Sequence, residues 1–332
     1  MPLIFNNHDD TLLTYEDASE LRDNGWIASD LHVHTLCSYD VLPAPSLKPE
    51  ALYEKGKKLG LEYITFTDHY TMRAHQILGE REELITGVEI RIKDTELAEH
   101  TVHVNVYDLD EEEFDELEEI SKIEGDLKAL VNYLKRKSIP FTYNHPFWFE
   151  PKEEPNLSAI PELIELFPVI EYNMHRVKKK NELAIALARK QGKGLVATTD
   201  SHPGMIGKVY TLSKGDTFRE YFKNIAAGRS YLVASNLTMQ DLIEEVNAWI
   251  ELIFNLDLMT ADLANFTTGI NYLDRLVRAL ASESLKNVPG LNKALEGLTY
   301  RLSNSGIPAS LYLRSENAIV PRIEDFMMAR LL

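Results

Sequence analysis

Short apolar stretches alternate with longer amphipathic stretches between residues 27 and 200. The apolar stretches have the length of strands, and residues two apart in a strand face the same side. We expect strands over 27–35, 62–69, 83–92, 101–109, 139–145, 169–173 and 194–200. Strands that alternate with helices are typical of α/β proteins with mostly parallel strands. Seven strands before residue 200 favour a barrel over an open sheet.

Apolar residues at helical spacing mark the segments between several of these strands. They recur from Leu127 to Leu134, for example, and form one stripe of an amphipathic helix. Helices are expected over 48–61, 125–138, 159–167 and 180–192. The acidic run 108–120 is expected to be a helix face in contact with solvent.

The pattern changes after about residue 235. Apolar residues keep helical spacing from Leu242 to Phe254 and again from Leu273 to Leu280, without strands between them. We therefore expect an α/β unit over 1–235 and a helical extension over 236–332. Long apolar helix faces need partners, so the extension packs on the α/β unit or on a second subunit, in a homo-oligomer. It contains no histidine, and we expect it to shape substrate access rather than chemistry.

Composition narrows the classes of function. The chain has 52 acidic and 35 basic residues, and its net charge of −17 argues against binding to nucleic acid or to an anionic membrane. No apolar run is long enough to cross a bilayer. The single cysteine excludes a disulfide within the chain, which favours a reducing cytoplasm. No glycine-rich loop follows the first strand, so nothing supports a dinucleotide cofactor.

The stretch "SDLHVHTLCSYD" over 29–40 contains two of the ten histidines of the chain. In a strand, Asp30, His32 and His34 share one face, and the apolar residues between them share the other. A structural histidine needs no such partners. A metal ion does, because it takes several nitrogen and oxygen ligands at once.

Further polar side chains fall at the ends of the other expected strands. They are Asp68, His69, Glu89, His103, His145, Asp200 and His202. Each also has a simpler interpretation: Glu89 can pair with Arg91, and an aspartate can cap the following helix. These interpretations do not explain why the residues all fall at strand ends, where parallel α/β barrels build their active sites. The number of ligands exceeds the need of one metal and predicts two or three ions.

Five motifs, "DLHVHT", "TDH", "GVE", "NHP" and "TDSH", occur in this order. With the segment 219–233, they make residues 26–235 resemble the polymerase and histidinol phosphatase (PHP) superfamily. The resemblance implies a distorted (β/α)7 barrel with two to three divalent ions, zinc, manganese or iron. Members of this superfamily mostly hydrolyse phosphate esters. The resemblance is specific for the superfamily and much less so for a substrate.

Carried over by motif, the resemblance implies nine metal ligands. They are His32, His34, Asp40, His69, Glu89, His103, His145, Asp200 and His202. Glu89 would bridge an ion held by His32 and His34 to a second ion. Some members carry histidine where this chain has Asp40, and aspartate there resembles the small-phosphatase branch. Asp30 and Asp68 adjoin ligands, and we interpret them as acceptors that orient imidazole rings.

No serine, threonine or cysteine forms an obvious nucleophile motif, so hydrolysis would use water. A hydroxide held between two ions would attack phosphorus, with the charge of the transition state offset by the ions. Arg91 and Arg176 are candidates for an added positive charge at the substrate. Lys208 and Arg73 are weaker candidates, and any of the four can be a surface residue. His175 can protonate the leaving oxygen or can be a loop histidine.

The leading prediction is an enzyme, a multinuclear metal-dependent phosphoesterase. Its substrate would be a small phosphorylated molecule, such as a nucleotide or a sugar phosphate, and Glu89, His175 and Arg176 would be its catalytic residues. A nuclease with a proofreading-type activity is the alternative, which the acidic charge disfavours. A non-catalytic metal-binding module is a third prediction. The same ions could also cleave an amide or a carboxylic ester.

Overall fold

The computed structural model describes residues 11–150, 153–256, 271–280 and 290–331 and has mixed α/β architecture. Its strands are β1 (Leu12–Leu13), β2 (Ile27–Asp30), β3 (Tyr63–Thr65), β4 (Leu84–Ile85), β5 (Gly87–Lys93), β6 (Thr101–Tyr107), β7 (Phe141–Tyr143), β8 (Val169–Asn173), β9 (Gly194–Thr198), β10 (Tyr210–Ser213) and β11 (Tyr231–Val233). These strands include one at or within each of the seven predicted segments.

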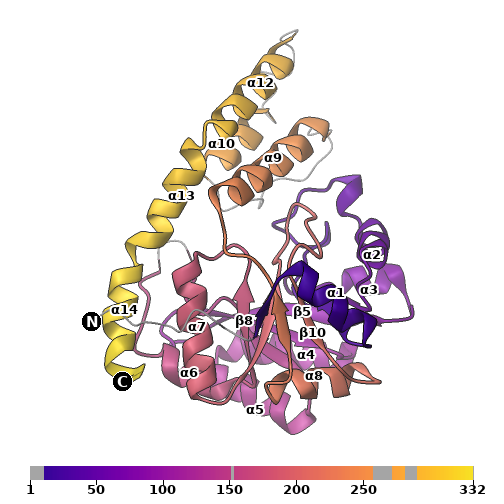
Figure 1. The fold of residues 1–332 in the computed structure, drawn as a ribbon, viewed down its shortest axis with the longest axis vertical. Helices are drawn as coiled ribbons and strands as arrows, with labels where there is room; N and C mark the ends of the chain where they lie inside the picture. The colour runs from indigo at the N-terminus through magenta and orange to yellow at the C-terminus, as the bar shows by residue number, and fades with distance from the viewer. Residues whose placement is uncertain (1–10, 151–152, 257–270, 281–289, 332) are drawn as a thin grey trace.

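Helices connect and cover these strands (Figure 1). In the first part of the chain they are α1 (Tyr15–Asp23), α2 (Pro49–Lys58), α3 (Arg73–Leu78), α4 (Glu111–Glu119), α5 (Leu127–Lys137), α6 (Ile160–Leu166), α7 (Lys178–Lys190) and α8 (Phe218–Ala226), with a 3-10 turn at Pro45–Leu47 and a π turn at Ile120–Glu124. The C-terminal part has α9 (Met239–Asn255), α10 (Asn271–Leu280), α12 (Leu291–Asn304), α13 (Ile307–Ala318) and α14 (Val320–Leu331). The helices predicted between the strands are thus confirmed. Beyond residue 235 every described element is a helix, and 257–270, 281–289 and 332 of the expected extension lie outside the described residues.

The strands form two mixed sheets. One has the order β1-β11-β10-β2-β3-β4, and the other has the order β5-β6-β7-β8-β9. Two isolated parallel bridges join the sheets beyond the named strands. Val33 pairs with Ser201, and His69 pairs with Glu89. The chain segments that follow β2 and β3 therefore meet the second sheet at the motifs singled out in the sequence.

The expectation of mostly parallel strands is wrong for part of the fold. β6 runs antiparallel to both β5 and β7, and β10 runs antiparallel to β2 and β11. The connection from β5 to β6 spans only residues 94–100, too few for the helical crossover that a parallel pair requires. Because β6 is reversed, its beginning, which carries His103, lies at the edge where β7 and β8 end.

The first predicted strand is shorter than expected. β2 ends at Asp30, and the chain continues past His32 and His34 without a ladder of its own. Hydrogen bonds to two neighbouring segments hold it there. The amide of His34 donates to Ser201 O at 3.1 Å, and the amide of Thr67 donates to Val33 O at 2.9 Å. Val33 itself is fully buried in the core.

The helical tail packs on the α/β unit of its own chain. Val246, Trp249 and Ile250 of α9 share a buried core with Leu52 and Ile64. α14 packs against α7, as Figure 1 shows on the left. The first of the two partners expected for the tail is therefore present. A homo-oligomer stays a prediction. Within the described residues, no helix is both long enough and apolar enough to cross a membrane.

Candidate metal centre

His32 and His34 stand beside Glu89 and Asp200 in a fully buried group. Nε2 of His32 lies 3.1 Å from Nε2 of His34, 3.1 Å from Oε2 of Glu89 and 3.2 Å from Oδ1 of Asp200. Nε2 of His34 lies 3.2 and 3.4 Å from the same two carboxylate oxygens. One imidazole nitrogen carries at most one proton and cannot satisfy three such neighbours. Four ligands about 2.1 Å from one ion in a tetrahedron lie about 3.4 Å apart, so this group fits a metal ion.

The second oxygen of Glu89 faces two other histidines. Its Oε1 lies 3.0 Å from Nδ1 of His103 and 3.6 Å from Nε2 of His145. Asn144 Nδ2 donates a hydrogen bond of 2.8 Å to the same oxygen. Oε2 of Glu89 also lies 3.4 Å from Nδ1 of His69. The two oxygens of this carboxylate thus face different sets of histidines, which is the arrangement of a carboxylate that bridges two ions.

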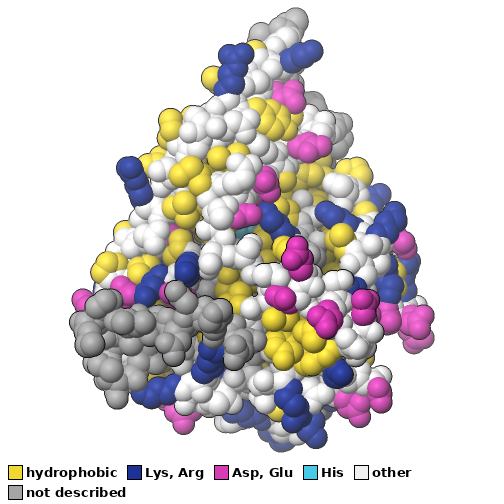
Figure 2. Space-filling view, viewed as in Figure 1, with side chains coloured by type: hydrophobic (Ala, Val, Ile, Leu, Met, Phe, Trp, Pro, Cys, Tyr) yellow, Lys and Arg dark blue, Asp and Glu magenta, His cyan; other side chains and the backbone are white. Residues whose placement is uncertain are grey.

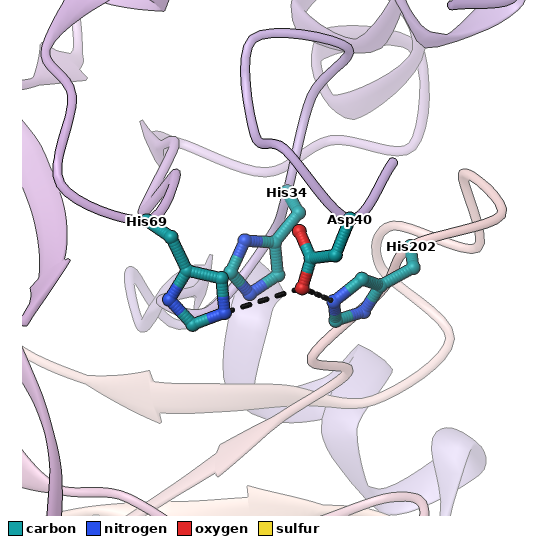
Figure 3. Close-up of side chains that lie close together, drawn as sticks. All are labelled: His34, Asp40, His69 and His202. Atoms are coloured by element: carbon teal, nitrogen blue, oxygen red, sulfur yellow. Dashed lines mark hydrogen bonds and ion pairs between the residues drawn. The ribbon is translucent and has the colours of Figure 1, made fainter. Parts of the chain in front are cut away.

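A third group surrounds Asp40 (Figure 3). Its Oδ2 lies 3.2 Å from Nε2 of His69 and 3.0 Å from Nε2 of His202. His34 completes the group, because its ring lies 4.3 Å from that of His202 and 4.9 Å from that of His69. The structure therefore gathers all nine residues that the sequence predicts as ligands into one region.

Two of these residues adopt an uncommon backbone conformation. His145 has a φ of 30° and Asp200 a φ of 48°, in the left-handed region that few residues other than glycine visit. Each lies two residues after the end of a strand, His145 after β7 and Asp200 after β9. A sharp turn there aims the side chains inward, and such conformations concentrate at functional sites.

Electrostatics keep the buried carboxylates ionised. Burial alone would raise the pKa of Glu89, but the neighbouring histidines, His32 foremost, hold it well below the usual range. Burial likewise opposes ionisation of Asp40 and Asp200, and neighbouring histidines hold the pKa of both well below the usual range. Ionised carboxylates are the form that binds cations.

Two of the candidate histidine ligands favour the neutral form. Burial lowers the pKa of His69 and of His145, and it outweighs the nearby carboxylates. A neutral imidazole has a free nitrogen for a metal. Nδ1 of His34 is also buried without a hydrogen-bond partner, a further polar atom that the protein alone does not satisfy.

Glu171 holds the first histidine from behind, and the sequence analysis missed it. Its Oε1 lies 2.6 Å from Nδ1 of His32, and Thr198 Oγ1 donates to the same oxygen at 2.6 Å. Its Oε2 accepts from the amide of His145 at 2.7 Å. A signal was present, because Glu171 is the one charged residue of the strand β8, where every residue is buried.

The roles expected for Asp30 and Asp68 are wrong. Asp68 accepts hydrogen bonds from the amide and hydroxyl of Thr35, at 2.6 and 2.7 Å. Asp30 accepts from the amide and hydroxyl of Thr199, at 3.0 and 2.6 Å. Both carboxylates therefore fix the backbone of neighbouring motif segments. Neither has an imidazole among its described hydrogen-bond partners, since each turns toward the adjacent loop.

A cavity of about 340 Å³ opens onto the candidate ligands. A histidine side chain is visible in Figure 2 between the helical tail and the α/β unit. Arg91, Arg176 and His175 line the cavity. Arg73 and Lys208 do not appear among its described lining residues. Arg73 is exposed at the start of α3, and Lys208 pairs with Asp241 at 2.9 Å.

The two arginines at the cavity are held in different ways. Arg91 forms an ion pair with Glu150 and a hydrogen bond with the hydroxyl of Tyr39. Arg176 is buried, its guanidinium lies 5.6 Å from the ring centre of Trp148, and its Nη1 lies 3.9 Å from Oε2 of Glu316. In both side chains Nε is buried without a hydrogen-bond partner. Positive charge is thus fixed beside the candidate ligands.

His175 is bound by a residue of the helical tail. Its Nδ1 lies 2.9 Å from Oε2 of Glu245 in α9, and its backbone carbonyl accepts from the hydroxyl of Tyr312 in α13 at 3.1 Å. Burial alone would lower the pKa of His175, but the Glu245 carboxylate raises it above the ordinary value. The sequence analysis did not foresee Glu245, because nothing in the pattern of α9 relates it to a distant loop.

No protein-family model and no curated protein matches this sequence. Several solved structures resemble parts of it. PsfC from Pseudomonas syringae is 18% identical, with 63% of this chain and 92% of that protein covered and a TM-score of 0.46. A protein from Bifidobacterium adolescentis described as a metal-dependent phosphoesterase is 15% identical, with 59% and 95% covered and a TM-score of 0.41. An amidohydrolase from Chromobacterium violaceum, with bound sulfate and no metal, is 14% identical, with 52% and 87% covered and a TM-score of 0.38.

Proposed function

We propose that this chain is a multinuclear metal-dependent phosphoesterase of the PHP type, acting on a small phosphate ester. Its α/β unit would be a distorted (β/α)7 barrel over 1–235, with 236–332 as the helical extension. Two isolated bridges support the barrel, because they connect the two sheets at Val33–Ser201 and at His69–Glu89. If these bridges are counted as strand pairs, a closed ring of seven strands results, in the order β2, β3, β5, β6, β7, β8 and β9.

One observation carries the proposal: the two oxygens of the buried Glu89 carboxylate face separate sets of histidines. His32, His34, Glu89 and Asp200 would hold one ion. Glu89, His103 and His145 would hold a second, and Asp40, His69 and His202 a third. Divalent ions, when bound, lower the pKa of water and offset the charge of a phosphoryl group.

The protein's own residues would bind and orient the ester. Arg91 and Arg176 bring fixed positive charge to the cavity, although the chain as a whole carries −17. Phosphate binds cations of this kind through charge-assisted hydrogen bonds. His175, whose pKa the Glu245 carboxylate raises against the effect of burial, would donate a proton to the leaving oxygen. All three of these side chains line the cavity.

The size of the cavity favours a small substrate over a polymer. Its volume of about 340 Å³ lies at the lower end of the range for small-molecule sites. Tail residues such as Trp249 and Tyr312 form part of its wall. A nucleic acid would need a track of positive charge beyond the ions, which the acidic composition does not supply.

Phosphate release tests the proposal. Protein loaded with manganese, zinc or iron should release inorganic phosphate from at least one small ester, lose this activity to a chelator and regain it with metal. Single-stranded DNA should be a much poorer substrate at about 0.15 M salt, where charge is screened beyond about 8 Å. Stepwise degradation of an oligonucleotide, without action on any small ester, would favour the nuclease instead.

A further inference from the structure

The helical tail gives the cavity an apolar wall. Leu242, Val246 and Trp249 come from α9, and Pro308 and Ala309 come from the first turn of α13. Leu242, Val246, Trp249 and Ala309 are each less than a tenth exposed. None of these five side chains carries a charge. The cavity is therefore apolar on the side of the tail, whereas histidines and carboxylates line it on the opposite side.

The polar groups that the tail adds to the cavity already have partners. Glu245 is paired with His175 at 2.9 Å. The hydroxyl of Tyr312 donates to the His175 carbonyl at 3.1 Å and accepts from Arg176 Nη1 at 3.4 Å. A substrate hydroxyl placed against this wall would lose water and gain few hydrogen bonds, which costs free energy. An apolar group there gains about 25 cal/mol for each Å² removed from water.

The side of the cavity that faces the candidate metal ligands favours a charged group. Arg91 and Arg176 line it together with seven of the candidate metal ligands. With cations bound as the proposed function requires, an anion is the natural ligand for that side. A ligand that satisfies both parts of the cavity has an anionic group and a compact apolar group. A sugar phosphate or a nucleotide, with several hydroxyls or ring polar atoms, satisfies only one part.

We propose that the substrate is a phosphate ester of an apolar alcohol, aromatic or alkyl, whose apolar group lies against Val246, Leu242 and Ala309. This inference rests on the proposed function, because the phosphoryl group is placed by that proposal. It replaces the sugar phosphate or nucleotide expected from the sequence with a more apolar class. The helical tail then acts as the specificity element of the enzyme.

Binding of a matched pair of phosphonates tests this class without turnover. Benzylphosphonate and 2,3-dihydroxypropylphosphonate share a P–CH2 group and are similar in size, but one has a ring and the other a diol. Calorimetry with the full, metal-loaded chain should show benzylphosphonate binding at least about tenfold tighter. Equal binding, or tighter binding of the diol, would overturn the inference.

Isosteric variants locate the preference on the wall. Val246→Thr keeps the shape and adds one hydroxyl, and it should reduce the ring preference at least about threefold. Ala309→Ser makes a smaller change of the same kind on the other helix and should reduce it in the same direction. Val277→Thr is the control, because Val277 is equally buried in the shared core but does not line the cavity. An equal effect of Val246→Thr and Val277→Thr would contradict the wall's role.

Hydrolysis separates failure of this inference from failure of the proposed function. Benzyl phosphate and glycerol 1-phosphate both release a primary alcohol, so their chemistry is comparable. A higher kcat/KM for benzyl phosphate supports the inference, and a higher value for glycerol 1-phosphate contradicts it while leaving a phosphoesterase in place. A tenfold binding preference without hydrolysis of either ester would support the wall and contradict the proposed function.

Discussion

Nδ1 of His175 lies 2.9 Å from Oε2 of Glu245, although the first residue follows a strand of the α/β unit and the second lies in the helical tail. The carboxylate holds the pKa of the imidazole above its ordinary value, against the effect of burial. The protonated form of His175 therefore persists to higher pH. This pair makes the tail a part of the site and not only a cover for the core.

Replacing Glu245 by Gln should shift the pH dependence of activity. The substitution removes the charge that raises the pKa of His175, so the imidazole loses its proton at lower pH. If the proton is donated to the leaving oxygen, the alkaline decline of kcat/KM should begin at lower pH in Glu245→Gln. The measurement is a pH profile of kcat/KM for both proteins. Unchanged profiles would mean that His175 only supports its loop.

Glu89 should be essential for both metal and activity. Its two oxygens face separate sets of histidines, so Glu89→Ala should remove metal and turnover together. Glu89→Gln keeps the shape without the charge and should still cost orders of magnitude in kcat. Elemental analysis and phosphate release would be measured on the same samples. Turnover above about a tenth of that of the wild type, a loss of only ~1.4 kcal/mol, would argue against a bridging role.

Glu171 should tune metal affinity without touching an ion. Its carboxylate orients His32 through a 2.6 Å contact to Nδ1, and loss of such a partner typically weakens metal binding about 10- to 100-fold. Competition with a chelator would measure the affinity of Glu171→Gln. Glu116→Gln, at an exposed position of α4, is the matched control and should bind metal like the wild type. Equal affinities of the two variants would remove Glu171 from the site.

The sequence predicted the candidate site best where histidines and carboxylates recur at the ends of strands. His34, His69 and His202 belong to separate motifs, and their convergence around Asp40 follows from the rule that one edge of an α/β fold collects such side chains. His103 reached the same edge for another reason, because β6 runs in the opposite direction. His103 therefore lies with the other candidate ligands although the expected strand direction was wrong.

Contacts between side chains far apart in the chain could not be predicted from the sequence. Glu245 has no neighbour in sequence that suggests a site, and only the packing of α9 on the α/β unit brings it to His175. The roles predicted for Asp30 and Asp68 were wrong for the same reason, because their partners too are set by the three-dimensional structure. A carboxylate beside a ligand can turn toward an imidazole or toward a loop, and the three-dimensional position of Thr35 and Thr199 decides which.

The metal content of the purified protein tests the central claim most directly. Eight of the nine candidate ligands form three overlapping groups, and His145 lies beside Glu89. Together they should hold at least two equivalents of transition metal per chain, measured by elemental analysis of protein prepared without chelator. The same protein should lose phosphate release when the metal is removed. Less than half an equivalent of metal, with no activation when manganese, zinc or iron is added, would contradict the account.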